Sequence, residues 1–292
     1  MRFLTLNTHS WCEIHQIAKI RTLAKFIIEQ QVDVIALQEV NQLTSTPVVK
    51  EPLNYRGGAG VPVHEDNYAL LLVQALNEMG ATYEWTLTEA HIGWDLYDEC
   101  VAILSRLPIR GIKPIDMSPE YGYHQVQRRA AQAALIETET GTFWCATTHM
   151  SWWDFDGEPL FAQEYTRLSQ ALAECALTAP VLLGGDFNSA AHLSDEGYAL
   201  VTSSGMVDTR SLAEHTDGEN TVHREIAGWE GNTDAKRIDF VFTDRLLTVN
   251  SHAVVFRDNS PEAISDHSGL LLDIDPSSWA PQSLLTPLTN QS

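Results

Sequence analysis

Six short segments of this 292-residue sequence combine acid, amide and histidine side chains, which bind hard metal ions and move protons. They are Leu6-Asn7-Thr8-His9, Leu37-Gln38-Glu39, Thr148-His149, Gly184-Gly185-Asp186-Phe187-Asn188, Arg237-Ile238-Asp239-Phe240 and Ser265-Asp266-His267. An apolar, β-rich run precedes most of them, so the polar groups would reach one end of a sheet, where loops converge. One such segment alone is more often a turn or a surface group. Together they predict a hydrolytic metal site.

Periodicity in the sequence predicts the elements that must position these segments. Strand patterns cover residues 2–6, 34–37, 83–88, 100–104, 130–136, 143–148, 181–184, 238–242, 249–256 and 269–274, and helical patterns cover 17–29, 68–79, 160–177 and 195–204. A strand, a helix and a strand, followed by mostly strands with a few helices, fit a sandwich flanked by helices. We expect one domain over residues 1–275 and a loose tail over 276–292, which is rich in Pro, Ser and Thr.

A long polar connection covers residues 41–66, with Gly57-Gly58-Ala59-Gly60 near its middle. No Gly-Lys-Ser/Thr follows these glycines, so a cradle for nucleotide phosphates is not indicated. Connections of this length in a compact domain are often functional. A plain surface loop and a lid over the pocket both fit the connection, and we favour the lid.

The composition argues about partners and compartment. The chain has 18 Lys and Arg against 39 Asp and Glu, a net charge of −21, which opposes binding to nucleic acid unless a divalent cation reverses the sign locally. The first residues form a strand rather than a signal peptide, and no apolar run could span a bilayer, so we expect a cytoplasmic protein with no membrane partner. The cysteines, Cys12, Cys100, Cys145 and Cys175, lack metal-ligand spacing and are predicted to be buried free thiols.

In their order, the six polar segments resemble those of the endonuclease/exonuclease/phosphatase family over residues 1–275. The resemblance implies an α+β fold, a four-layer sandwich in which two mixed β-sheets pack face to face with helices outside. It also implies hydrolysis of a phosphate ester by metal-assisted, in-line attack of water. Members act on DNA, RNA, phospholipids, inositol phosphates and sugar phosphates, so the family alone does not name the substrate.

Such hydrolysis needs charge neutralisation, an activated water and stabilisation of the leaving oxygen. Glu39 follows a strand and is the best single candidate for a Mg²⁺ ligand, and Asn7 could offer its amide oxygen. Both match the family's metal-binding Glu and Asn, and Asp266 resembles a second carboxylate of the metal site. Mg²⁺ is the implied cofactor, with Mn²⁺ as an alternative. His9 stands where some members carry a carboxylate, which favours one ion over two.

The segment around Asp186 is the most specific motif. Asp186 and Asn188 lie two residues apart, so an extended backbone would point both to one face, with Phe187 turned inward. By resemblance, Asp186 orients or deprotonates the attacking water and Asn188 contacts the phosphate. An Asp-Asn turn after a buried strand is the structural alternative.

Two histidines match family positions that contact phosphate. By resemblance, Asp239 hydrogen-bonds one ring nitrogen of His267, which then acts as an imidazolium or a proton donor. His149 matches the second histidine, where abasic-site endonucleases carry a tyrosine. Glu99 matches a carboxylate that holds this histidine in the deoxyribonuclease branch, and its neighbour Asp98 would face the other way on a strand.

Loop residues must decide the substrate. The candidates for substrate binding are Trp152, Trp153, Trp229 and Arg129. Exposed tryptophans could hold sugar faces, stack on bases or plug loop interiors. Arg129 could touch phosphate, although a surface pair with Arg128 is the commoner arrangement. His9 and Trp11 could line the pocket or simply pack within their loop.

Basic residues are scarce in these loops, and a neutral ring carrying one phosphate fits them better than a nucleic-acid strand. The opening segment through Trp11, the pair at 152–153 and the loop at Trp229 resemble a bacterial branch that dephosphorylates maltose 6′-phosphate. The leading hypothesis is a Mg²⁺-dependent phosphomonoesterase acting on this or a similar phosphorylated sugar. A metal-dependent nuclease or phosphodiesterase on the same core is the alternative. A non-catalytic scaffold would not need the motifs that the chain retains.

Overall fold

A computed structural model of the chain describes residues 1–57, 62–226 and 228–279. The strands are β1 (Arg2–Asn7), β2 (Val34–Leu43), β3 (Glu84–Gly93), β4 (Tyr97–Ser105), β5 (Ile109–Asp116), β6 (Ala130–Thr138), β7 (Gly141–His149), β8 (Val181–Asp186), β9 (Val207–Asp208), β10 (Ala213–Asp217), β11 (Asp239–Thr243), β12 (Thr248–Val255) and β13 (Gly269–Asp275). The α-helices are α1 (Gln16–Glu29), α2 (Tyr68–Glu78), α3 (Leu160–Ala176) and α4 (Gly197–Ser203), and the 3-10 helices are η1 (Ser10–Cys12), η2 (Thr209–Leu212) and η3 (Pro276–Ser278). Each predicted α-helix is present and begins and ends close to the expected residues.

The strands form two mixed sheets. The seven-stranded sheet has the order β10-β12-β13-β1-β2-β4-β3, and the six-stranded sheet has the order β5-β6-β7-β8-β11-β9. β1 pairs parallel with β2 and antiparallel with β13, and β8 pairs parallel with β7 and antiparallel with β11. Both sheets therefore contain the mixture of directions that the family resemblance implied.

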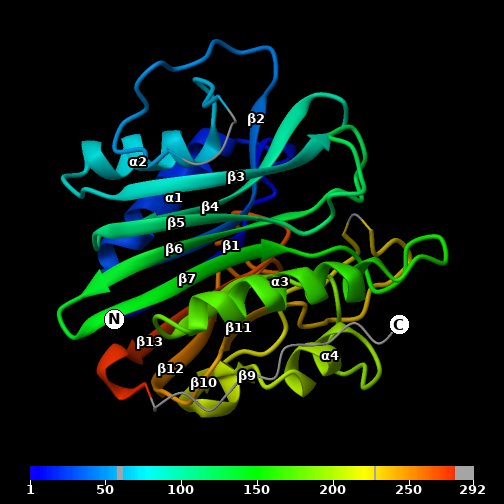
Figure 1. The fold of residues 1–292 in the computed structure, drawn as a ribbon. Helices are drawn as coiled ribbons and strands as arrows, with labels where there is room; N and C mark the ends of the chain where they lie inside the picture. The colour runs from blue at the N-terminus through cyan, green and yellow to red at the C-terminus, as the bar shows by residue number, and fades with distance from the viewer. Residues whose placement is uncertain (58–61, 227, 280–292) are drawn as a thin grey trace.

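The layer order follows from where the apolar side chains point. Leu23 of α1 and Leu72 of α2 pack on the outer side of the seven-stranded sheet, and Leu168 of α3 packs on the outer side of the other sheet. Phe3 of β1 and Phe143 of β7 meet between the sheets. Each such buried side chain contributes about 1.5–3 kcal/mol of transfer free energy. Figure 1 shows the two helical layers on opposite sides of the stacked sheets, so the chain forms the predicted four-layer sandwich.

Strand register gathers the polar segments. Asn7 at the end of β1 lies opposite Gln38 of β2, and His149 at the end of β7 lies opposite Asp186 at the end of β8. β11 runs antiparallel to β8, so its first residue, Asp239, also lies opposite Asp186. Polar groups from distant parts of the sequence therefore meet at one edge of the sandwich.

Three strands, β5, β9 and β10, were not predicted. β5 contains Gly111 and Pro114 and lies at the edge of the six-stranded sheet. Proline cannot donate a hydrogen bond to a neighbouring strand, so it argues against a central strand but is tolerated at an edge. In addition, β2, β3 and β4 extend well beyond the runs 34–37, 83–88 and 100–104.

The connection after β2 is tied to that strand. Gln42 donates to the backbone oxygen of Pro62 at 2.8 Å and accepts from the backbone nitrogen of His64 at 3.0 Å. Trp11 donates to the backbone oxygen of Asp66 at 3.1 Å, which packs it against this connection. Residues 58–60 of the predicted glycine cluster lie outside the described residues, so the lid stays a prediction.

The start of the tail and the cysteines can be compared with their predictions, as can the lengths of the helices. η3 begins the predicted tail, Trp279 stacks on Phe143 with 5.3 Å between ring centroids, and residues 280–292 lie outside the described residues. All four cysteines are free thiols, but Cys12 is exposed rather than buried because η1 lies at the surface there. Within the described ranges, no helix combines the length and hydrophobicity that a bilayer-spanning segment needs.

Candidate active site

A cavity of about 440 Å³ opens where the polar strand ends meet, a size typical of pockets for small molecules. Seven of its polar lining residues, which we call the floor, are Glu39, Glu99, Arg129, His149, Asp186, Asn188 and His267, and His9, His91 and Asp266 line it as well. Its solvent-exposed lining residues, which we call the rim, are Trp94, Val126, Gly228 and Glu230. Strands, or residues within two positions of a strand end, supply the floor, whereas turns and loops supply the rim.

Asn7 joins the two sheets at the floor. Its side-chain nitrogen donates to Glu39 Oε1 at 2.9 Å and to Asp186 Oδ2 at 3.0 Å, and its side-chain oxygen accepts from the backbone nitrogen of His9 at 3.1 Å. The structure therefore turns the amide nitrogen, not the predicted oxygen ligand, toward the carboxylates, because carboxylates accept hydrogen bonds and cannot donate them. Asn7 thereby fixes a carboxylate of β2 relative to one of β8.

Glu39 reaches the floor through a bulge in β2. The register of β2 against β4 shifts between Leu37 and Val40, and Glu39 itself has a φ of 49°. A bulge re-aims a side chain, and a left-handed backbone at a non-glycine residue is strained. Burial raises the pKa of Glu39, and the negative charge of Glu99 adds to the rise. A carboxylate held in such surroundings favours a nearby cation.

His267 lies buried between two aspartates. Its Nδ1 is 3.0 Å from Asp239 Oδ2 and its Nε2 is 3.6 Å from Asp186 Oδ2. Burial lowers the pKa of His267, but the charges of Asp239 and Asp186 outweigh burial and hold this pKa well above its usual value. The ligand atoms of these three residues lie within 4.8 Å of one another, as in a metal site. Because each ring nitrogen already faces a carboxylate, we interpret the trio as a fixed imidazolium with its counterions.

His149 and Arg129 share the carboxylate of Glu99. Glu99 Oε1 is 3.3 Å from His149 Nδ1 and 3.4 Å from Arg129 Nη1. Burial and the charge of Arg129 lower the pKa of His149, but the hydrogen bond to Glu99 helps to raise it above its usual value. Arg129 is only 2% exposed, so it is not the surface residue that its sequence context suggests. Arg128 turns away and donates to the backbone oxygen of Ala90.

Asn188 is held by neighbours on several sides. It has a φ of 43°, so it enters the pocket through a left-handed turn rather than the expected extended backbone, while Phe187 is buried as predicted. Its Oδ1 accepts from Trp229 Nε1 at 3.1 Å, and its Nδ2 donates to the backbone oxygen of Met150 at 3.0 Å and lies 3.1 Å from His149 Nε2. Trp229 therefore orients a floor residue and, contrary to expectation, does not line the pocket.

The adjacent tryptophans point to different places. Trp152 lines the pocket, with the guanidinium of Arg129 5.8 Å from its ring centroid. Trp153 instead packs against Phe161 of α3 with 5.9 Å between ring centroids, so the structure does not bring it to the predicted substrate site. Gly228 lies so close to Trp152 that a Cβ at this glycine would be 2.1 Å from the ring. The loop at Gly228 thus fixes the position of Trp152.

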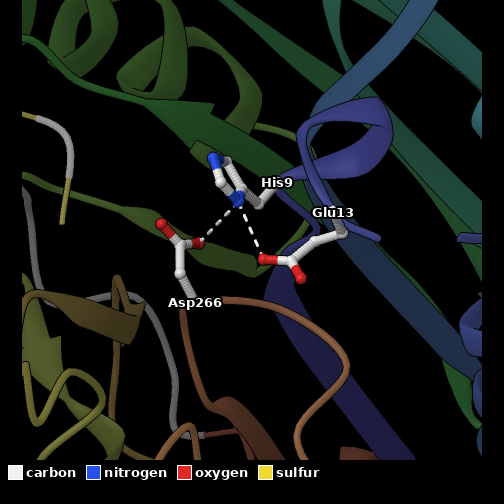
Figure 2. A group of neighbouring side chains, drawn as sticks. All are labelled: His9, Glu13 and Asp266. Carbon is white, nitrogen blue, oxygen red and sulfur yellow. Dashed lines mark hydrogen bonds and ion pairs between the residues drawn. The ribbon is translucent and has the colours of Figure 1, made fainter. Parts of the chain in front are cut away.

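Beside the floor, the imidazole of His9 lies between two carboxylates, as Figure 2 shows. His9 Nδ1 is 2.8 Å from Glu13 Oε1 and 3.5 Å from Asp266 Oδ1, and Glu13 also pairs with Lys19. Burial lowers the pKa of His9, but hydrogen bonds with Cys12 and Glu13 and the charge of Asp266 raise it to about 11. A positive imidazole here is compatible with the predicted single ion. Unlike His9, Trp11 lies outside the pocket.

Several lining residues were not among the predicted candidates. They are His91, Ile92, Gly93, Trp94, Val126, Ile226, Gly228 and Glu230. His91 Nε2 is 3.6 Å from Glu99 Oε2, and burial lowers the pKa of His91 to about 4, so this ring is neutral near pH 7. A Trp-Asp pair between two strand patterns was the only signal for Trp94. Gly228 and Glu230 lie in the loop around Trp229 that the sequence singled out, whereas the remaining residues had no pattern that could mark them.

The donor set fits a hard divalent cation. Burial together with the charges of Glu99 and Asp266 raises the pKa of Glu39. The protein groups alone therefore leave repulsion between these neighbouring carboxylates, which a bound cation would relieve. Carboxylate and amide oxygens suit Mg²⁺ or Mn²⁺, and no cysteine appears among the described residues that line the pocket. Glu39 and Asp266, with Asn7 after rotation of its amide, are the residues that would hold the ion.

Comparison with known proteins agrees with the fold. A model of the Endonuclease/Exonuclease/phosphatase family matches residues 17–267. This match identifies a class of hydrolases that act on phosphate esters and generally depend on divalent metal ions. The chain belongs to the endonuclease/exonuclease/phosphatase family. No match is found among curated proteins.

Solved structures show how widely the fold is used. A family protein from Leptotrichia buccalis is 29% identical, with a TM-score of 0.81 over 94% of this chain and 99% of that one. A Bacteroides thetaiotaomicron protein named mannosyl-6-phosphatase is 17% identical, with a TM-score of 0.66 over 94% and 99% of the two chains. D. rerio TDP2, complexed with a single-strand DNA product, is 16% identical, with a TM-score of 0.62 over 94% and 98%. The last two share the fold alone, so the fold does not choose between sugar and nucleic acid.

Proposed function

We propose that this protein is a Mg²⁺-dependent phosphomonoesterase that acts on a phosphorylated sugar, maltose 6′-phosphate or a similar disaccharide phosphate. The observation that carries the proposal is the charge of the pocket. Among its described lining residues, Arg129 is the only Lys or Arg, and it is paired with Glu99. Nucleic-acid sites present several free cations to successive phosphates. The single phosphate of a neutral sugar can be bound by the floor residues alone, without further cations.

The ion belongs at Glu39 and Asp266, with Asn7 beside them. When bound, a divalent ion supplies Lewis-acid polarisation of a phosphoryl oxygen and neutralises developing charge. The remaining chemistry belongs to side chains of the floor. They must orient the water, bind the other phosphoryl oxygens and assist departure of the sugar oxygen.

Asp186 is the residue we assign to the attacking water. Its Oδ2 accepts from Asn7 at 3.0 Å and its Oδ1 accepts from the backbone nitrogen of Asn188 at 2.9 Å, so its carboxylate is held in one orientation. Each carboxylate oxygen has a second lone pair, which can accept a hydrogen bond from water. Asp186 thereby orients the water and takes its proton as the new bond to phosphorus forms.

His267, His149 and Asn188 surround the place where the phosphoryl group would lie. The imidazolium of His267, kept charged by Asp239, can bind a phosphoryl oxygen or give a proton to the leaving sugar oxygen as its bond to phosphorus breaks. His149 is oriented by Glu99 and can bind a second phosphoryl oxygen. The products are inorganic phosphate and the free sugar.

Phosphate release tests this function. The purified protein is given maltose 6′-phosphate, glucose 6-phosphate, an inositol phosphate and a DNA duplex, each with Mg²⁺, with Mn²⁺ and with EDTA. Metal-dependent release that is fastest from the disaccharide phosphate is the expected result. Cleavage of DNA without release from any sugar phosphate would replace the proposal by the nuclease alternative.

A further inference from the structure

Trp94 stands out on the rim because a large apolar ring is left in solvent beside the floor. It lies at the turn between β3 and β4, lines the pocket and is 74% exposed. A tryptophan ring left in water forgoes the free energy that its burial would contribute. An exposed aromatic ring at the mouth of a polar pocket is therefore a candidate contact for a ligand.

The backbone of this turn is strained at Trp94 itself. Trp94 has a φ of 56° and Asp95 a φ of 53°, and the backbone nitrogen of Leu96 donates to the oxygen of Gly93 at 3.0 Å. Turns with positive φ at both central residues usually contain Asn or Gly there, and an aromatic residue is a conformational outlier. Such strain persists where function selects the side chain.

The turn is also anchored from both sides. The backbone nitrogen of Thr44 donates to the oxygen of Leu96 at 3.1 Å, and the backbone nitrogen of Ile92 donates to the oxygen of Tyr123 at 2.9 Å. The second contact ties the end of β3 to the loop that carries Val126, which is 41% exposed and also lines the pocket. A ligand would therefore meet a surface that is already in place, which lowers the entropic cost of binding.

The surroundings of Trp94 indicate a neutral ligand with hydroxyl groups. Ile92 and Val126 extend the apolar surface, and the only acidic rim residue is Glu230, whose Oε1 accepts from the backbone nitrogen of Gly228 at 3.0 Å. The other carboxylate oxygen of Glu230 can accept a hydrogen bond from a hydroxyl group of the ligand. A sugar ring presents an apolar C–H face to an aromatic ring and hydroxyls at its edge, whereas a phosphate chain would be repelled by Glu230.

We propose that Trp94 is the specificity residue for the alcohol part of the substrate, a platform that takes the sugar ring farther from the phosphate in a neutral disaccharide phosphate. This inference rests on the proposed function and deepens it. Trp94 then separates a disaccharide phosphate from a small phosphate ester, while the floor treats the two alike.

The test compares Trp94→Asn with the wild type on two substrates. Asn suits a positive φ, so this variant removes the ring without disturbing the turn, and its thermal midpoint should be no lower than that of the wild type. We expect kcat/KM to fall roughly tenfold for maltose 6′-phosphate, equal to about 1.4 kcal/mol, and to stay unchanged for glycerol 2-phosphate. Trp94→Tyr, which keeps an aromatic ring, should retain most activity. Leu96→Ala, at an exposed residue of the same turn that does not line the pocket, is the matched control.

Binding of free maltose, followed by saturation-transfer NMR, separates this inference from the proposed function. Equal losses on both substrates, or no loss, together with maltose binding that survives Trp94→Asn, would overturn the platform while leaving the phosphatase. No sugar-phosphate turnover, together with maltose binding that needs Trp94, would overturn the phosphatase and keep the platform. Loss of oligonucleotide cleavage alone in Trp94→Asn would overturn both, because the ring would then stack on bases.

Discussion

The floor and the rim of the pocket are built in different ways. The floor consists of charged and amide groups on strands or next to strand ends, each with close partners; Glu39 and Asp186, for example, both accept from Asn7. The rim consists of turn and loop residues, and its largest side chain, Trp94, lies mostly in water. The floor is thus fixed by the sandwich itself, and the rim by local turns.

This difference suggests that the floor and the rim have different roles. Buried ionic groups need partners, so a change in one floor residue disturbs others and should affect every substrate. The exposed rim side chains, above all Trp94, lie mostly in water, so a change there should affect only ligands large enough to reach them. Chemistry should follow from the floor and substrate choice from the rim.

The largest effect is expected at Asp186. Asp186→Asn keeps the shape of the side chain but removes the carboxylate that we assign to the water. We expect kcat to fall by about 1000-fold on small and large phosphate esters alike. The thermal midpoint should fall as well, because Asn has one acceptor oxygen where Asp186 accepts two hydrogen bonds. Steady-state kinetics on glycerol 2-phosphate and maltose 6′-phosphate measure this, and normal turnover would remove Asp186 from the proposed role.

His252, a buried histidine outside the pocket, tests whether a buried imidazole needs a carboxylate beside it. Floor histidines lie beside carboxylates, whereas both ring nitrogens of His252 lack a hydrogen-bond partner among the described residues, and burial lowers the pKa of His252 to about 4. The unfolded chain, with a pKa near 6.5, then binds the proton first, so His252 reduces stability as pH falls from 6.5 toward 4.

We therefore expect the free energy of unfolding of the wild type to fall by about 2 kcal/mol more than that of His252→Phe when the pH is lowered from 7 to 5. Urea unfolding at both pH values measures this difference. A difference independent of pH would mean that His252 is protonated or solvated in the folded state.

A smaller effect is expected at Trp229, which the structure links to Asn188 rather than to a ligand. Trp229→Phe removes the N–H that donates to Asn188 Oδ1 but keeps most of the ring. We expect kcat to fall roughly tenfold with little change in KM, since one orienting hydrogen bond is worth about 1 kcal/mol or somewhat more. A rise in KM confined to the disaccharide phosphate would instead assign Trp229 to the rim.

The smallest effect on activity is expected at Trp153. Its ring packs on Phe161, away from the pocket, so Trp153→Leu should lower stability by about 1–3 kcal/mol and change kcat/KM by less than about twofold. Thermal unfolding and kinetics on maltose 6′-phosphate measure the two quantities. A selective loss on the disaccharide phosphate would return Trp153 to the substrate site.

Most of the strands and the polar strand ends of the floor could be predicted because their signals are local. Apolar runs of strand period end directly at Asn7, His149 and Asp186, and parallel or antiparallel pairing then brings these ends together. The exact contacts were less predictable. The bulge at Glu39 and the left-handed turn at Asn188 depend on neighbouring strands, which a sequence pattern does not contain.

Neither the rim nor the direction of single side chains beside it could be predicted, because both depend on the tertiary fold. Trp152 and Trp153 are adjacent and identical in type, yet one lines the pocket and the other packs on α3. Arg129 and Arg128 differ in the same way, since only Arg129 turns toward Glu99. Trp94 lies outside the six polar segments, and the nearby candidate Glu99 did not mark it. Its exposure follows from the turn geometry between β3 and β4.

The most direct test of the account is the ratio of kcat/KM for maltose 6′-phosphate to that for a 5′-phosphorylated single-stranded oligonucleotide, with Mg²⁺ at low ionic strength. Low salt favours binding of a polyanion, so this condition is the least favourable for the sugar. We expect the sugar phosphate to be preferred roughly 100-fold or more. A ratio near one, or a preference for the oligonucleotide, would contradict the assignment of a sugar-selective rim above a phosphatase floor.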